Sequence, residues 1–178
     1  MELSDEAKRT FRVQDYAPKP PIKGVEIVEL ARHTDDGGSL TELGRFQAGA
    51  SAVFGGFVLA QANWSEMEPG AIKAFHLHER QTDLWFVPAS DKVLLVLLDV
   101  RAGSPTEGTR MRFVLGDGHS RLVRIPPGVA HGCRNVGPTR ARIIYFTDTH
   151  FSPAPDSSDE GRLPWDFAGA DVWEIARE

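Results

Sequence analysis

The sequence lacks several features that mark particular classes of protein, namely paired cysteines, long apolar runs and a targeting peptide. It has one cysteine, Cys133, so it cannot form an internal disulfide, which suits a reducing compartment. No apolar run approaches the roughly 20 residues that are needed to span a bilayer. The first ten residues carry charges of both signs and no apolar stretch, unlike a signal or transit peptide. We therefore expect a cytoplasmic protein without a membrane partner.

Positive charge is also scarce. The chain has 20 Lys and Arg against 25 Asp and Glu, and its basic residues form no stripe, so we expect no nucleic-acid partner. Hydrophobic residues make up 41% and charged residues 25%, which is ordinary for a folded protein. A length of 178 residues fits one domain. We expect that domain to span 1–178, with a core over about 24–150 and with 151–178 packed on it.

The apolar pattern predicts an all-β fold with short helical segments only at the two ends. Short runs rich in Val, Ile, Phe and Leu alternate with turns that contain Gly, Pro or Asp, as in a sandwich or a closed barrel. The polar, proline-rich stretch 152–161 is typical of a surface loop. The expected strands are 24–30, 39–46, 53–64, 71–78, 84–87, 92–100, 111–115, 121–125 and 140–147.

Three histidines and an aspartate form a pattern that can bind a metal. His76 and His78 lie two residues apart on an expected strand, so both side chains point to the same face. Asp83 follows across a polar turn, and His131 follows the Pro126-Pro127-Gly128 turn. This arrangement resembles the two cupin motifs and therefore predicts a jelly-roll barrel, the double-stranded β-helix.

Three imidazoles and one carboxylate suit a divalent transition metal such as Mn, Fe, Co, Ni or Zn. The alternative for the same side chains is a set of hydrogen-bonded histidines without a metal.

Several segments, in the right order, resemble the dTDP-4-dehydrorhamnose 3,5-epimerase family. They include 61–65 (QANWS), 99–106 (DVRAGSPT) and 125–132 (IPPGVAHG), and the resemblance extends over nearly all of 24–173. It implies a homodimer that needs no cofactor and acts on a small-molecule substrate, a nucleotide-activated keto-deoxy sugar. In this family a histidine removes the proton next to the C4 ketone, a lysine stabilises the enolate and a tyrosine returns the proton.

Carried over position by position, the resemblance places the base at His76 and a second retained histidine at His131. Tyr145 matches a tyrosine near the sugar. The substrate-binding positions fall on Glu42, Gln61, Asn63 and Lys73, the last in place of a phosphate-binding arginine.

The departures from the family fall on catalytic positions. The catalytic tyrosine is replaced by Phe151, the lysine by Asp83 and a glutamine by His78. Because Phe151 has no proton to give and Asp83 would repel an enolate, we expect the chain not to perform ordinary two-centre epimerisation.

Three hypotheses therefore stay open. The chain is an epimerase or isomerase with an altered catalytic set, a metal-dependent cupin enzyme acting on a small keto or polar substrate, or a non-catalytic sugar-binding cupin.

Overall fold

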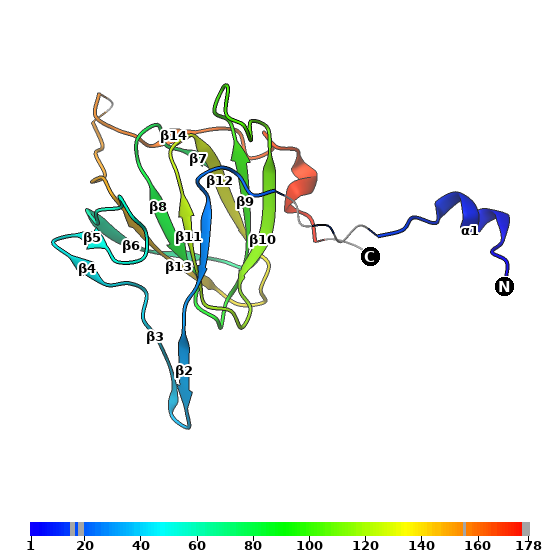
Figure 1. Cartoon of the computed structure of the whole chain (residues 1–178), viewed down its shortest axis with the longest axis horizontal. Helices are drawn as coiled ribbons and strands as arrows, with labels where there is room; N and C mark the ends of the chain where they lie inside the picture. Colours follow the sequence, from blue (N-terminus) through cyan, green and yellow to red (C-terminus); the bar gives the residue numbers. More distant parts are fainter. Residues whose placement is uncertain (15–16, 18–19, 155, 176–178) are drawn as a thin grey trace.

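Two five-stranded antiparallel sheets, packed face to face, make up most of the computed structural model, which describes residues 1–14, 17, 20–154 and 156–175 (Figure 1). The first sheet has the strand order β1 (Glu26–Glu29), β11 (Arg121–Ile125), β8 (Asp83–Phe86), β13 (Ala141–Thr147) and β6 (Gln61–Met67). The second has the order β10 (Arg110–Gly116), β9 (Lys92–Asp99), β12 (Val129–Asn135), β7 (Ile72–Leu77) and β14 (Gly161–Arg162). From β6 to β14, consecutive strands alternate between the two sheets except for the β9–β10 hairpin, which is the jelly-roll arrangement that the sequence predicts.

Four further strands form two hairpins, and the helices among the described residues are short. The hairpins pair β2 (Arg32–Asp35) with β3 (Gly38–Thr41) and β4 (Phe46–Gln47) with β5 (Ala50–Ser51). Helix α1 (Asp5–Thr10) and the 3₁₀ helix η1 (Ala170–Trp173) lie near the two ends of the chain, as expected. Neither described helix has the length or apolar character needed to cross a membrane.

The core lies between the sheets because successive side chains of each strand point to opposite faces. On β9, Val93, Leu95 and Leu97 are fully buried in the cluster between the sheets. Their neighbours Leu94 and Val96 face the other side and are buried as well. The second sheet is therefore covered on both faces, which explains the nearly continuous apolar run of β9.

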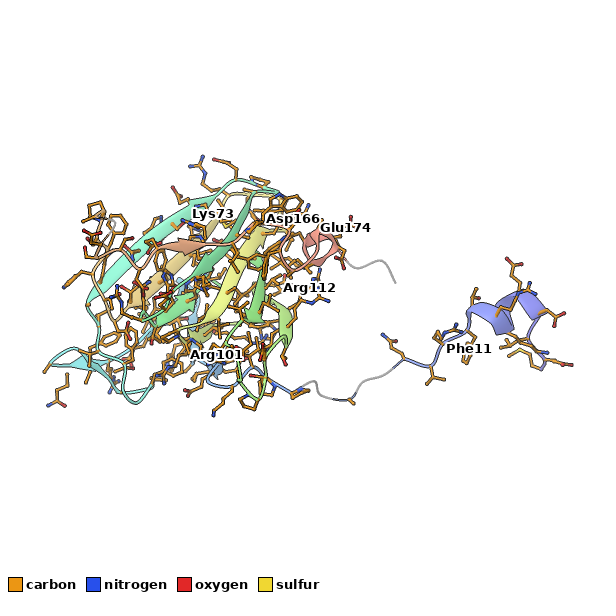
Figure 2. The ribbon with its side chains drawn as sticks, turned by 90° about the horizontal axis from the view of Figure 1, so that it is seen from above. Phe11, Lys73, Arg101, Arg112, Asp166 and Glu174 are labelled. Carbon is orange, nitrogen blue, oxygen red and sulfur yellow. The ribbon has the colours of Figure 1, made fainter. Side chains whose placement is uncertain are left out.

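The segment near the C-terminus supplies the outer cover of the second sheet. Trp173 is 1% exposed, packs 5.2 Å from the Phe75 ring and donates from Nε1 to the Trp165 carbonyl. Arg112 donates to backbone carbonyls of this segment, including that of Glu174, and Figure 2 shows the two residues side by side. These contacts attach the segment to the barrel, while the assignment of the whole chain to one domain stays a prediction.

The strand predictions hold for most of the barrel and fail near the N-terminal third. The expected strand 53–64 is wrong over 53–60, because the Gly55-Gly56 turn, with Gly56 at φ +79°, breaks the run and buries Phe54 and Phe57 against the first sheet. The expected strand 39–46 is split, since β3 ends at Thr41 and β4 begins at Phe46. The expected ranges contain no counterpart of β2, β5, β12 (Val129–Asn135) or β14.

Candidate active site

A cavity of about 550 Å³ lies between the sheets and collects most of the predicted site residues. Its wall contains Gln61, Asn63, Lys73, His76, His78, Asp83 and Tyr145. His131 is buried just behind this wall, with its ring 5.7 Å from that of His76 and 5.3 Å from that of His78. Glu42 does not line the cavity and instead pairs with Arg45.

His76 is a neutral imidazole whose Nε2 accepts a hydrogen bond. The Nη1 atom of Arg162 lies 2.6 Å from this nitrogen, and a guanidinium group can only donate. Burial, followed by the neighbouring charges of His131, Arg162 and His78, lowers the pKa of His76 to about 3. The side chain is therefore unprotonated and chemically able to accept a proton.

Asp83 is the centre of a buried polar network at the start of β8. Its carboxylate accepts hydrogen bonds from Gln81 Nε2 at 2.7 Å and from Trp85 Nε1 at 3.0 Å. Burial alone would raise the pKa of Asp83, but the interactions with His131, His78 and Trp85 outweigh it and keep the pKa below its usual range. The cavity thus contains one ionised, buried carboxylate.

The two histidines next to Asp83 are held in the same orientation. The Nδ1 of His131 lies 3.1 Å from the Val129 carbonyl, and the Nδ1 of His78 lies 2.5 Å from the Asp159 carbonyl. Because a carbonyl only accepts, Nδ1 is a donor in both rings, and Nε2 is the nitrogen that faces Asp83. These Nε2 atoms lie 3.4 Å (His131) and 3.9 Å (His78) from Asp83 Oδ2.

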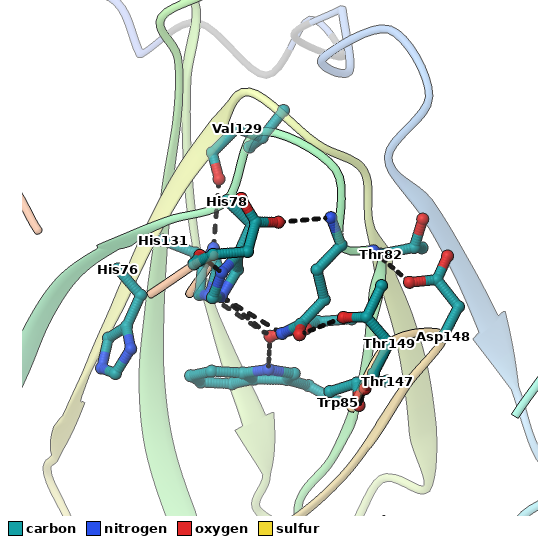
Figure 3. A network of polar contacts seen from close by, with 12 residues as sticks. His76, His78, Thr82, Trp85, Val129, His131, Thr147, Asp148 and Thr149 are labelled. Carbon is teal, nitrogen blue, oxygen red and sulfur yellow. Dashed lines mark hydrogen bonds and ion pairs between the residues drawn. The ribbon is translucent and has the colours of Figure 1, made fainter. Parts of the chain in front are cut away.

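The three side chains thus direct potential ligand atoms at one point, and these atoms all lie within 4.8 Å of one another. His76 is outside this cluster, and in Figure 3 its ring stands apart from the others.

The turn between His78 and Asp83 is held by residues that the sequence analysis did not identify. The Asp159 carboxylate accepts from the backbone N–H groups of Glu79, Arg80 and Gln81. Asp148 likewise accepts from the N–H of Thr82. No local pattern marks these aspartates, because Asp is common in polar loops and their partners lie 66 or more residues away.

Tyr145 faces the cavity from the sheet opposite to that of His76. In the strand register it pairs with Asn63 on β6 and with Trp85 on β8. Partial burial, then the nearby carboxylates of Asp83 and Glu160, raise the pKa of Tyr145 above its usual value. The phenol is therefore protonated near neutral pH and can donate.

The remaining cavity wall includes Phe151, whose ring is 58% exposed. Its backbone N–H donates to Gln61 Oε1, and Gln61 Nε2 donates to Asn63 Oδ1. Lys73 projects from β7, with Nζ 2.9 Å from both Ser65 Oγ and the Glu66 carbonyl. Figure 2 shows Lys73 near the edge of the barrel.

The family model described as dTDP-4-dehydrorhamnose 3,5-epimerase matches residues 19–166. The chain belongs to this family. Its relatives include the spore coat polysaccharide biosynthesis protein SpsL of Bacillus subtilis, 44% identical over 145 residues, which cover 82% of this chain and 91% of SpsL.

Solved structures agree with this assignment. The dTDP sugar isomerase of Desulfovibrio desulfuricans G20 matches with a TM-score of 0.71 and 28% identity over 90% of this chain and 94% of that one. A dTDP-6-deoxy-D-glucose-3,5-epimerase from Legionella pneumophila, solved with dTDP-4-keto-L-rhamnose, matches with a TM-score of 0.64 and 27% identity over 75% and 71% of the two chains. The comparisons confirm the predicted cupin fold and the class of sugar-nucleotide epimerases, a family that needs no cofactor.

Proposed function

We propose that this protein epimerises a nucleotide-activated 4-keto-6-deoxy sugar, with His76 as the base. The observation that carries the proposal is an unprotonated, largely buried His76 in a cavity large enough for a sugar. Gln61 and Asn63 lie on the same wall and offer amide groups to the substrate. The Legionella relative, solved with a dTDP-keto sugar, supports this substrate class.

The geometry also supports a route for the proton. His76 belongs to β7 of the second sheet and Tyr145 to β13 of the first, so a sugar between them has a base on one face and a protonated phenol on the other. Removal of the proton next to the ketone gives an enolate, and return of a proton from Tyr145 inverts that carbon. His131 stacks against His76 and supports the orientation of its ring.

The test is deuterium incorporation from D₂O into dTDP-4-keto-6-deoxyglucose, followed by proton NMR. His76→Asn should abolish exchange, and Tyr145→Phe should slow it by about 10²-fold or more, the usual size of general acid–base catalysis. His119→Asn, an exposed histidine outside the cavity, should exchange like the wild type. Tight binding of the sugar nucleotide without any exchange would instead establish a non-catalytic sugar-binding protein.

The surroundings of one atom, Nε2 of His131, favour a second candidate function, metal-dependent catalysis. The buried Nε2 of His131 has no hydrogen-bond partner among the described residues, yet it faces the Asp83 carboxylate at 3.4 Å. A lone pair that faces a carboxylate oxygen is repulsive unless a proton or a cation lies between them.

The cluster fits a metal. Two ligands that are each about 2.1 Å from an ion lie about 3.0–3.5 Å apart; the 3.4 Å from His131 to Asp83 is within this range, and the 3.9 Å from His78 to Asp83 is longer. Carbonyl acceptors on Nδ1 are also the usual outer partners of metal-binding histidines. We propose that His78, Asp83 and His131 can bind Mn, Fe, Co, Ni or Zn, which would polarise a keto or hydroxy oxygen.

Metal analysis and chelation test this site. A bound ion should be stoichiometric, and its removal should lower the melting temperature, because a ligand at a hundredfold excess over its dissociation constant stabilises the fold by about 2.7 kcal/mol. His78→Gln, which restores the family residue, should weaken the response to chelator. A protein that takes up no metal and melts identically with chelator would refute the metal site.

We further propose a homodimer in the cytoplasm. The β2–β3 hairpin projects from the sheets (Figure 1), and Leu40 near its tip is 68% exposed. Trp64 is 60% exposed on β6, which is an edge strand. A second copy would cover this apolar edge.

Light scattering decides the oligomeric state. Trp64→Glu should dissociate the dimer, whereas Phe11→Glu, an exposed apolar residue near α1, should not. A wild-type monomer at micromolar concentration would contradict the proposal. The buried thiol of Cys133, which has no disulfide partner, supports the cytoplasmic location.

A further inference from the structure

The cavity wall contains a positively charged residue that the sequence analysis did not identify, Arg162. It lies on the two-residue strand β14, whose register places it directly beside His76 of β7. Two backbone hydrogen bonds between Leu163 and Phe75, of 3.0 and 3.1 Å, hold this strand in place. The neighbouring Gly161 permits the close approach, since a Cβ there would lie 2.5 Å from the Leu77 carbonyl oxygen. The pairing of β14 with β7 therefore places the Arg162 guanidinium next to His76.

Permanent positive charge is scarce around the cavity. Of the side chains that line it, only Lys73 and Arg162 carry such a charge. Lys73 is engaged by Ser65 and by the Glu66 carbonyl, at the position where the family places a phosphate ligand. At the position of the family's lysine stands Asp83, a carboxylate. Arg162 contacts His76 directly, so it is the cation in this lining that lies beside an enolate formed next to His76.

We infer that Arg162 stabilises the enolate oxygen, in the role of the lysine that this chain lacks. The inference rests on the proposed epimerase function. Its basis is the 2.6 Å contact between Arg162 Nη1 and the nitrogen of the proposed base.

The proton transfer explains how one guanidinium can contact first His76 and then the enolate oxygen. The C–H bond next to the ketone breaks, its electron pair forms the C=C bond, and the carbonyl π pair moves onto oxygen as the proton passes to His76 Nε2. That nitrogen must first lose its hydrogen bond from Arg162. The freed N–H can then donate to the new oxyanion, because a guanidinium offers five donors in a planar fork. Once His76 is protonated, the two cations repel each other, so transfer of Arg162 to the oxyanion is favoured in the same step.

The experiment compares Arg162→Ala, Arg162→Lys and Arg162→Met with the wild type in the deuterium-exchange assay. Loss of one donor to a developing oxyanion costs about 10²–10³ in kcat. Arg162→Ala and Arg162→Met should show that loss with KM changed by less than about threefold, and Arg162→Lys should retain part of the rate. A low, non-denaturing concentration of guanidinium chloride should restore exchange in Arg162→Ala but not in His76→Asn. Arg9→Gln, on α1, is the control that should behave like the wild type.

The outcomes separate this inference from the proposed function. A rise in KM with an unchanged kcat would show that Arg162 binds the diphosphate of the substrate, and would overturn the enolate role. Exchange at the wild-type rate in Arg162→Ala would overturn it as well. In both cases His76→Asn would still abolish exchange. Absence of exchange in the wild type would refute the epimerase function, and the inference with it.

Discussion

Replacing Phe151 with tyrosine restores the phenol that the family resemblance places at this position. The ring lines the cavity and is 58% exposed, so one added oxygen meets little steric resistance. Its backbone N–H is already held by Gln61, and this contact does not depend on the ring. Stability should therefore change by no more than about 0.5 kcal/mol.

The effect on catalysis should be much larger. A correctly placed general acid accelerates proton transfer by about 10²–10⁴-fold, which corresponds to about 2.7–5.4 kcal/mol in the barrier. In the wild type Tyr145 is the one phenol in the described cavity wall, so we expect rapid exchange at one of the two carbons, C3 or C5, and slow exchange at the other. Phe151→Tyr should raise the slow rate about 100-fold or more.

Proton NMR in D₂O reports both carbons of dTDP-4-keto-6-deoxyglucose separately. Phe167→Tyr is a matched control, because Phe167 is 51% exposed and does not line the cavity. Rapid exchange at both carbons in the wild type would refute the reasoning, since Phe151 would then limit nothing. An unchanged slow rate in Phe151→Tyr would show that the phenol cannot reach the substrate from this position.

The remaining predictions concern stability. Asp99 is 1% exposed and accepts hydrogen bonds from Arg101, Ser104 and Thr106, so Asp99→Asn should cost about 3 kcal/mol and lower the melting temperature by about 6–12 °C. The Arg101 hydrogen bond holds the pKa of Asp99 below its unfolded value, so its contribution is present above about pH 4 and is lost as the pH falls. Denaturant titrations from pH 7 to 3 should thus be less pH-dependent in the variant. Gly132→Ala would place a Cβ 2.4 Å from the Ala74 Cβ, and calorimetry should show a loss of about 1–3 kcal/mol. Asp159→Ala removes the acceptor of three N–H groups in the turn before Asp83, and amide exchange there should accelerate.

The sequence predicts the barrel and much of its interior because both depend on local periodicity. Side chains two residues apart on a strand share a face, and His76 and His78 do both line the cavity. The turn at 126–128 does precede a strand that carries His131, although the expected ranges contain no strand there. The strand prediction over 53–60 fails because a strand and an apolar loop that packs on the sheet have similar composition.

The contacts that complete the site could not be predicted, because they depend on where the chain returns. Residues 152–161 were expected to be a surface loop, and most of them are exposed. However, Asp159 reaches the turn after His78, and Arg162, just past the loop, reaches His76, about 80 residues earlier in the chain. Neither residue type is distinctive in a polar segment. Only the pairing of β14 with the edge of β7 brings them to the cavity.

The residues around Asp83 should depend on its carboxylate, so that restoring the family's lysine alone should not restore its function. The variant Asp83→Lys tests this. The variant restores the family's residue, but Trp85 Nε1 and Gln81 Nε2 now donate to the Asp83 carboxylate and would be left facing an ammonium group. The new cation would also take the place of a side chain that is only 3% exposed, next to His131, without a carboxylate partner in the described lining other than Glu160. We expect a loss of about 3–5 kcal/mol in the free energy of unfolding.

Deuterium exchange in folded Asp83→Lys should not exceed the wild-type rate, because Arg162 already supplies a positive charge beside His76. Denaturant unfolding and the exchange assay measure the two effects independently. A variant as stable as the wild type that also exchanges faster would show that Asp83 merely replaced the lysine and that the surrounding donors had not adapted to it. In that case a lysine at position 83 on β8 would stabilise the enolate, and Arg162 on β14 would not have taken over that role.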